Sequence, residues 1–185
     1  MVRCLVLVAM LAAGNAHAQV ALGFKGVALG ADRAVLVDRF PALRCRSADA
    51  GSRYDETCRA IVCPGQACAE SWNALRTYGG VEIDGVVFQL LAGRFEGFEI
   101  AFPWYDWGRV RDAAKGAYGD GFEEVQQMQG LRGLPYPSRV WGIELPSGRM
   151  AIFERAGGDR GLLTCRSGTL DATPKRAPPQ KGGDT

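Results

Sequence analysis

The chain has 185 residues, of which 47% are hydrophobic, and its formal net charge is +2. This length is enough for one domain with a buried core, or for two small domains. A net charge so close to zero does not create the field that gathers nucleic acid or an acidic membrane surface. We therefore expect neither of them as a partner.

Residues 1–18 have the three parts of a secretory signal peptide. Arg3 supplies the positive charge, a short apolar run ends at Ala13, and Ala16-His17-Ala18 places small residues before a cleavage site at Gln19. The apolar run is too short to cross a bilayer, which takes about 20 residues. We therefore expect cleavage after Ala18 and a periplasmic or secreted protein with no integral membrane span.

His17 is the only histidine of the chain, so the cleaved protein would have none. Histidine is the usual general base near neutral pH and the commonest metal ligand. Its absence excludes a Ser-His-Asp triad, a Cys-His pair and the histidine-based zinc sites. The sequence also lacks a G-x-S-x-G elbow, an S-x-x-K motif, a calcium-binding loop and a phosphate-binding loop. We expect no catalytic residue, no metal and no cofactor.

One class of enzyme survives this exclusion. Two carboxylates can hydrolyse a glycosidic bond without histidine. A carboxylate-dependent hydrolase acting on envelope glycans is therefore the alternative hypothesis, and it requires two acids that face one cleft. The candidate acids are Glu82, Asp84, Glu96 and Glu99.

The first predicted elements are a helix and a strand. Asp32 can cap a helix over residues 32–40, and Pro41 prevents its continuation. Residues 42–46 are predicted to form a strand that carries a cysteine. Residues 47–70 are polar, and we interpret them as a long loop held by cysteines.

The central part predicts a hairpin followed by a second helix. Strands at 83–91 and 94–103 are joined by a turn at Ala92-Gly93, and the second strand alternates apolar residues with small or charged ones. An apolar stripe predicts a helix over residues 106–118, with glycine at its end. The pattern predicts no firm structure for residues 119–137.

The last predicted elements are strands at 139–145 and 149–155, joined by Pro146-Ser147-Gly148, and a strand at 161–166. Residues 167–185 are rich in proline, glycine and lysine and are expected to be disordered. The remaining residues, 19–166, are expected to form a single domain.

The order of these elements predicts an α+β fold. It indicates two tandem helix-plus-antiparallel-strand units, at about residues 23–103 and 104–166, each with a helix and about three strands. The two units would form one sheet that is covered by the two helices.

Cysteines in an oxidising compartment are expected to form disulfides. The spacing of Cys58, Cys63 and Cys68 lacks the C-x-x-C motif of a thiol oxidoreductase, and a zinc site of four thiolates is the less favoured alternative. Sequence alone does not choose the connectivity. Of the possible pairings we favour Cys63–Cys68 and Cys45–Cys58, which leaves Cys165 as a buried thiol on a strand.

One segment is a candidate binding feature, because residues 102–107 contain four aromatic side chains at a strand-to-helix corner. Exposed Trp, Tyr and Arg are enriched in the hot spots of protein interfaces. Alternatively, Phe102 and Trp107 belong to the core, and only the two aromatic residues between them are partly exposed. The candidate binding residues are Trp104, Tyr105, Trp107, Arg109 and Arg111.

Four short segments, most of them rich in glycine, form a recognisable series: Phe24-Lys25-Gly26-Val27-Ala28-Leu29-Gly30, Phe40-Pro41, Thr77-Tyr78-Gly79-Gly80 and Ala117-Tyr118-Gly119. With them, residues 23–166 resemble small uncharacterised secreted proteins of proteobacteria. The arrangement is similar, more distantly, to the β-lactamase-inhibitor-protein type, a tandem helix-plus-strands fold that binds proteins and is not an enzyme. The resemblance implies no site residues, and the extra cysteines between Cys58 and Cys68 depart from its pattern.

The resulting hypothesis is a non-catalytic periplasmic or secreted binding protein whose partner is another envelope protein. It would bind through the face of its sheet or through the 102–111 corner. A third possibility is a structural component of the envelope that is tethered through the basic tail, which deletion of residues 168–185 would test.

Overall fold

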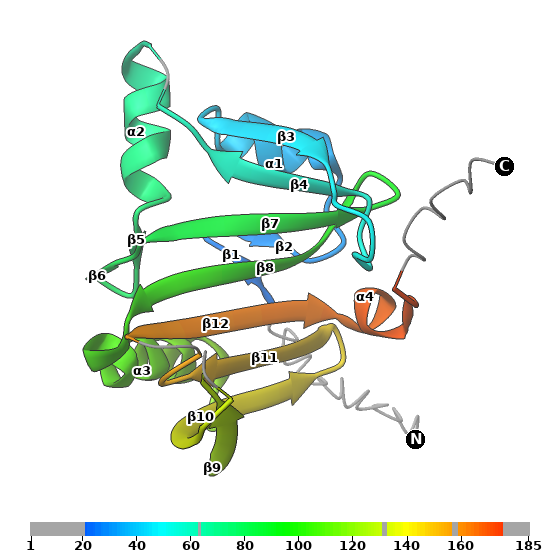
Figure 1. Cartoon of the computed structure of the whole chain (residues 1–185). Coiled ribbons are helices and arrows are strands. Elements are labelled where there is room, and N and C mark those ends of the chain that lie inside the picture. Colours follow the sequence, from blue (N-terminus) through cyan, green and yellow to red (C-terminus); the bar gives the residue numbers. More distant parts are fainter. Residues whose placement is uncertain (1–20, 63, 131–132, 157–158, 176–185) are drawn as a thin grey trace, which may run out of the picture.

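An antiparallel sheet of eight strands, in the order β3-β4-β7-β8-β12-β11-β10-β9, organises the chain (Figure 1). The computed structural model describes residues 21–62, 64–130, 133–156 and 159–175. The expected signal peptide lies outside these residues, as does the end of the tail.

The eight strands are β3 (Leu43–Ser47), β4 (Glu56–Ala60), β7 (Gly85–Leu91), β8 (Arg94–Pro103), β9 (Phe122–Gln129), β10 (Pro135–Leu145), β11 (Gly148–Phe153) and β12 (Arg160–Ser167). Two small hairpins are formed by β1 (Gly23–Phe24) with β2 (Val27–Ala28) and by β5 (Thr77–Tyr78) with β6 (Val81–Glu82). The helical segments are α1 (Arg33–Arg39), α2 (Gln66–Ala74), the short η1 (Trp104–Asp106), α3 (Trp107–Tyr118) and α4 (Gly168–Ala172).

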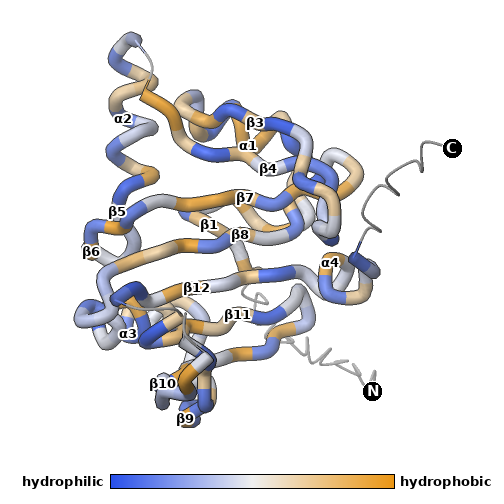
Figure 2. Tube along the Cα trace, in the orientation of Figure 1, coloured by the Kyte–Doolittle hydropathy of each residue, from blue (hydrophilic) through white to orange (hydrophobic). Residues whose placement is uncertain are grey.

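The core lies on one face of the sheet. Phe88 of β7, Phe98 of β8 and Leu163 of β12 are fully buried there, and Figure 2 shows hydrophobic residues gathered along β7 and β8. Helices α1 and α3 supply Leu36 and Val110 to the same cluster of buried residues. Alternation of side chains along a strand places every second residue on this face. The fold is therefore α+β, as the sequence predicts.

The strands fall into two sets on either side of the centre of the sheet. Helix α1 precedes β3, β4, β7 and β8, whereas α3 precedes β9, β10, β11 and β12. The last strands of the two sets, β8 and β12, lie side by side. Each helix is thus followed by four strands of the sheet, where the sequence indicates about three.

Strand β4 and the first half of α2 lie in the segment 47–70, which the sequence predicts to be a loop. Cys58 is the one fully buried residue of β4 on the core face, and the other residues of this strand are polar or small. The strand therefore lacks the alternation of hydrophobic residues that would predict it. The buried residues of α2 are Cys68 and Ser71. Neither strand nor helix carries the aliphatic stripe on which the prediction depends.

The interpretation of the two remaining segments is also wrong in part. Strand β9 forms within 119–137, although seven of its eight residues are exposed. Helix α4 forms at the start of the supposedly disordered tail: Ser167 caps it by accepting a hydrogen bond from Leu170, whose side chain is buried. A deletion that tests tethering must therefore begin after α4, because removing residues 168–185 would also remove the buried Leu170.

The turn between β7 and β8 is the expected Ala92-Gly93 hairpin, and it places a non-glycine residue in the left-handed region. The φ angle is +51° at Ala92 and +75° at Gly93. Alanine there costs about 1–2 kcal/mol, and asparagine is preferred in such turns. We expect Ala92→Asn to raise the free energy of unfolding by about 0.5–1 kcal/mol in urea titrations, and Gly93→Ala to lower it. A loss of stability in the first variant would contradict this account.

Candidate functional site

The second face of the sheet, opposite α1 and α3, is largely open, and Figure 1 looks onto it, with α1 behind the sheet. Helix α4 covers one end of this face, where Leu170 lies beside Gly97 of β8. Residues directly opposite each other on antiparallel strands share a face. A single row of such residues crosses all eight strands on this open face. In sheet order it consists of Arg44, Arg59, Val87, Glu99, Thr164, Ala151, Gly142 and Phe122.

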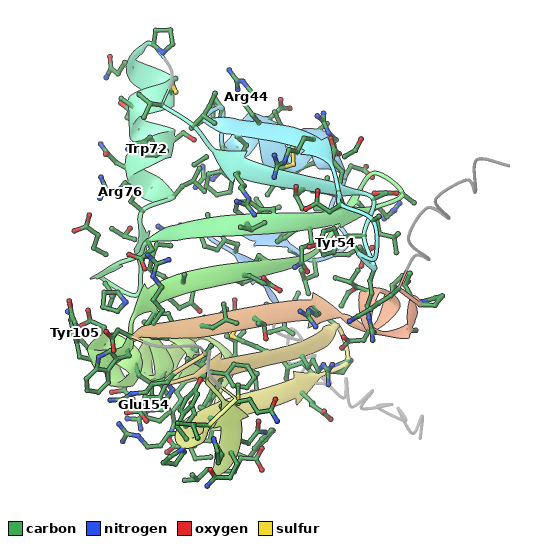
Figure 3. The ribbon with its side chains drawn as sticks, viewed as in Figure 1. Arg44, Tyr54, Trp72, Arg76, Tyr105 and Glu154 are labelled. Atoms are coloured by element: carbon green, nitrogen blue, oxygen red, sulfur yellow. A yellow bond between two sulfur atoms is a disulfide. The ribbon has the colours of Figure 1, made fainter. Side chains whose placement is uncertain are left out.

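A hollow of about 970 Å³ opens on this face over β4, β7, β8 and β12. Val87 and Leu162 line it from the sheet, and Trp72 of α2 and Arg76, which follows the end of that helix, line it from the side. Tyr105 lines it from η1, and Figure 3 labels Trp72, Arg76 and Tyr105 near the same end of the strands. Helix α2, which the sequence does not predict, therefore supplies part of this candidate site.

Two smaller hollows continue along the open face, with volumes of about 420 and 390 Å³. Leu162 lines both the main hollow and the 420 Å³ hollow, whereas Glu99 lines the main hollow and the 390 Å³ one. Arg166 lines both smaller hollows and forms an ion pair with Glu99 at 2.9 Å. The three hollows thus lie next to one another around the Glu99–Arg166 ion pair.

The acids of the main hollow are all paired with arginines. The pairs are Glu82–Arg76, Asp84–Arg160 at 3.3 Å, Asp106–Arg109 at 3.1 Å and Glu99–Arg166 at 2.9 Å. Three of the four candidate catalytic acids therefore line one hollow, whereas Glu96 is buried elsewhere and accepts a hydrogen bond from Ser167. Each of the three is paired with an arginine and partly exposed to solvent.

Three arginines at the β3 edge of the open face lack a carboxylate partner among the described residues. Arg44 and Arg59 stand directly opposite each other on β3 and β4, and Arg46 lies two residues further along β3. Arg44 donates hydrogen bonds to the carbonyl oxygens of Pro41 and Leu43, at 3.1 and 2.8 Å. Like charges that face each other across strands are destabilising, so the opposition of Arg44 and Arg59 does not stabilise the sheet. We call Arg44, Arg46 and Arg59 the basic patch. The sequence Arg44-Cys45-Arg46, with an arginine on each side of the cysteine, was the pattern from which this patch could have been predicted in part.

The aromatic corner divides into buried and exposed parts. Phe102 is fully buried and Trp107 is only 2% exposed, whereas Tyr105 is 72% exposed. Trp104 is half-buried, and the guanidinium of Arg155 lies 4.3 Å from the centre of its ring. Of the aromatic binding candidates, Tyr105 is therefore the one that lines the main hollow and is open to a partner.

The two arginine candidates of the corner are engaged in different ways. Arg109 lines the main hollow; it pairs with Asp106 and donates a hydrogen bond to the carbonyl oxygen of Gly80 at 3.0 Å. Arg111 lies on the other side of α3, where it pairs with Glu123 at 3.2 Å. Arg109 thus belongs to the open face, and Arg111 helps to join α3 to β9.

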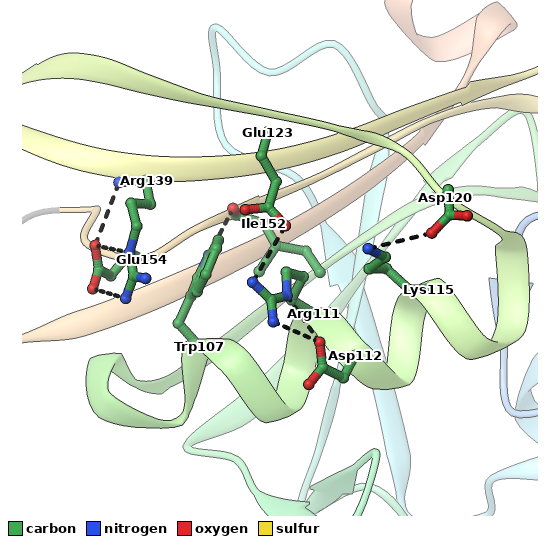
Figure 4. Close-up of polar contacts among 9 residues, drawn as sticks. All are labelled: Trp107, Arg111, Asp112, Lys115, Asp120, Glu123, Arg139, Ile152 and Glu154. Atoms are coloured by element: carbon green, nitrogen blue, oxygen red, sulfur yellow. Dashed lines mark hydrogen bonds and ion pairs between the residues drawn. The ribbon is translucent and has the colours of Figure 1, made fainter.

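Trp107 is held by a polar network on the helix side of the sheet. Its indole N–H donates a hydrogen bond to the carbonyl oxygen of Ile152 at 3.1 Å, and Figure 4 shows Arg111 and Arg139 on either side of the ring. Their guanidinium carbons lie 4.8 and 4.5 Å from the ring centre. Arg139 also donates a hydrogen bond to Glu154 and holds the pKa of that carboxyl below its usual range. Trp107 is therefore a structural residue.

The cysteines follow the favoured pairing as far as the structure describes them. Cys45 and Cys58 form a disulfide between opposite positions of β3 and β4. Cys68 is disulfide-bonded, and Cys63 lies outside the described residues. Cys165 is a buried free thiol on β12, and burial raises its pKa.

Comparison with known proteins identifies no relative: no family model, no curated protein and no solved structure matches the chain. Among the described helices, none is both long enough and apolar enough to cross a membrane.

Proposed function

We propose that this chain is a non-catalytic periplasmic or secreted binding protein that holds a protein partner, another envelope protein, on the open face of its sheet. The observation that carries the proposal is the 970 Å³ hollow, open to solvent and bordered by Trp72, Tyr105 and Arg109. Tryptophan, tyrosine and arginine dominate the binding energy of protein interfaces. Secretion is supported by the leader pattern of residues 1–18.

The basic patch supports a partner segment that carries carboxylates. Arg44 and Arg59 repel each other in the free protein, and a carboxylate placed between them would remove that repulsion and accept hydrogen bonds from both guanidinium groups. The other charges of the neighbouring hollow are already paired. An acidic side chain next to an apolar or aromatic one is thus the chemistry that fits this end of the face.

Two structural repeats are part of the same proposal. A helix followed by four sheet strands occurs twice, with β8 and β12 in the centre. This order supports the tandem arrangement and the likeness to the β-lactamase-inhibitor-protein type, whose members bind proteins.

Site-specific photocrosslinking tests the proposed function. A photoreactive amino acid at Tyr105, on the open face, is expected to give one discrete heterologous adduct in cells that produce the protein. The matched position is Val35, which is exposed on α1 away from that face. Equal adducts from both positions, or none from Tyr105, would refute the proposal.

The charge of the basic patch gives a sharper prediction. Arg59→Glu is expected to abolish the adduct at Tyr105, and Arg59→Lys to retain part of it. The same Arg59→Glu variant is expected to be more stable by about 0.2–1 kcal/mol, because it places opposite charges across β3 and β4. Thermal unfolding measures this second effect. Retained crosslinking by a folded Arg59→Glu variant would contradict the role of the patch.

The hydrolase remains the second candidate, because Glu82, Asp84 and Glu99 line one hollow. It predicts that the purified protein degrades envelope glycans and that Glu99→Gln abolishes this activity. The binding protein and the hydrolase would both hold their ligand on the same face. The assay of glycan degradation therefore distinguishes the two hypotheses.

A further inference from the structure

Strand β9 is a terminal strand of the sheet, and β10 is the one neighbour with which it pairs among the described strands. Seven of its eight residues are exposed, on both faces of the sheet. Two of them are apolar: Phe122 is 52% and Val125 65% exposed. The outer edge of β9 therefore presents free backbone donors and acceptors beside apolar side chains.

Natural proteins protect such edges with proline, lysine, bulges or short strands. The sequence of β9, Phe-Glu-Glu-Val-Gln-Gln-Met-Gln, contains no proline, glycine or lysine, and its register with β10 is continuous. Its last five residues carry no charge. The opposite edge, β3, is only five residues long and carries Arg44 and Arg46. The contrast indicates that β9 is covered by another strand in the functional state.

We propose that β9 pairs antiparallel with β9 of a second copy of this chain, which gives a two-fold dimer with one sheet running through both copies. The proposal does not depend on the function of the open face. Its basis is that the strand is complementary to itself, in charge and in side-chain type.

The register that places Val125 opposite itself pairs residues 122–128 of the two copies. It sets Phe122 against Met128, Glu123 against Gln127 and Glu124 against Gln126 of the second copy. Every acid then faces an amide, and no two like charges are opposed. Residues that face each other in this register also lie on the same side of the sheet, because their numbers are both even or both odd.

A pairing of β9 with β3 of another copy is the competing arrangement, since the two edges differ in charge. Such a head-to-tail contact is heterologous, so it would build rings or fibres and not a two-fold dimer. The two-fold pairing gives a closed dimer and leaves β3, with its arginines, free for the open face.

Sedimentation equilibrium over the micromolar range is expected to show a monomer–dimer equilibrium for the full secreted chain. Val125→Lys would place two lysines opposite each other and is expected to abolish the dimer. Because position 125 is exposed, this variant is expected to unfold like the wild-type protein when both are measured at concentrations at which the wild type is monomeric. A monomer at every concentration would overturn the proposal, and higher assemblies would favour the β3 contact instead.

Cysteine crosslinking tests the register in the folded protein, independently of any destabilised variant. Val125→Cys is expected to form a disulfide-linked dimer on mild oxidation, as seen on a non-reducing gel. Gln127→Cys on the same strand, which would face Glu123, and Val35→Cys on α1 are the matched controls and are expected to remain monomeric. Absence of a dimer with Val125→Cys, or equal yields at all three positions, would overturn the proposed pairing.

Discussion

Replacing Trp107 by alanine is expected to lower the free energy of unfolding by about 3–5 kcal/mol. The side chain is 2% exposed and packs between α3 and β11, and its indole N–H is bonded to the carbonyl oxygen of Ile152. Truncation leaves a cavity and also deprives Arg111 and Arg139 of the ring on which they rest. Urea titration followed by circular dichroism measures the change.

Tyr105→Ala is the matched control, because it removes an aromatic ring from the same corner at a position that is 72% exposed. Its expected effect is within about 0.5 kcal/mol. Equal losses in both variants would contradict the division of the corner into a structural and a binding part. The same Tyr105→Ala variant is expected to weaken the proposed partner binding, because Tyr105 lines the main hollow.

Replacing both Cys45 and Cys58 by alanine is expected to lower the free energy of unfolding by about 3 kcal/mol. The disulfide joins residues that are 13 apart in sequence and restricts the loop between β3 and β4 in the unfolded chain. It also anchors the edge strand that carries the basic patch. Denaturant unfolding without reductant measures the loss.

Cys68 provides the internal control, because it is disulfide-bonded as well. Reductant is expected to lower the free energy of unfolding of the wild-type protein by more than the double substitution does. Reductant is also expected to lower that of the double variant further, because it breaks the disulfide of Cys68. An unchanged unfolding midpoint in the double variant would contradict a stabilising role for Cys45–Cys58.

Helices α1 and α3 and the two long hairpins could be predicted from the sequence, because each buries a regular series of apolar residues. Phe98, Ile100 and Phe102 point to the core from alternate positions of β8. The missed elements bury too little for such a pattern. Helix α2 has a cysteine and a serine as its buried residues, and β9 is stabilised by backbone pairing with β10.

The candidate site was predictable only in part for the same reason. Tyr105 could be predicted as a binding candidate, because residues 102–107 contain four aromatic side chains. Trp72 lies on the helix that was missed, and the apposition of Arg44 with Arg59 depends on the register of β4. A residue that functions through a neighbour on another strand leaves no periodic signal in its own segment.

The sequence by itself determined the α+β class and the lack of histidine outside the leader pattern, because composition and local periodicity are properties of the chain alone. It favoured the Cys45–Cys58 bridge, and the pairing of β3 with β4 decided it. Tertiary structure decided which face of the sheet stays open and which acids form ion pairs with arginines. It also placed β9 at the edge of the sheet, with β10 as its one neighbour among the described strands. These depend on strand order and register, which bring together residues that lie far apart along the chain. The short length and near-zero charge therefore limit the classes of partner that we consider, whereas the pairing of its strands decides which residues the open face presents.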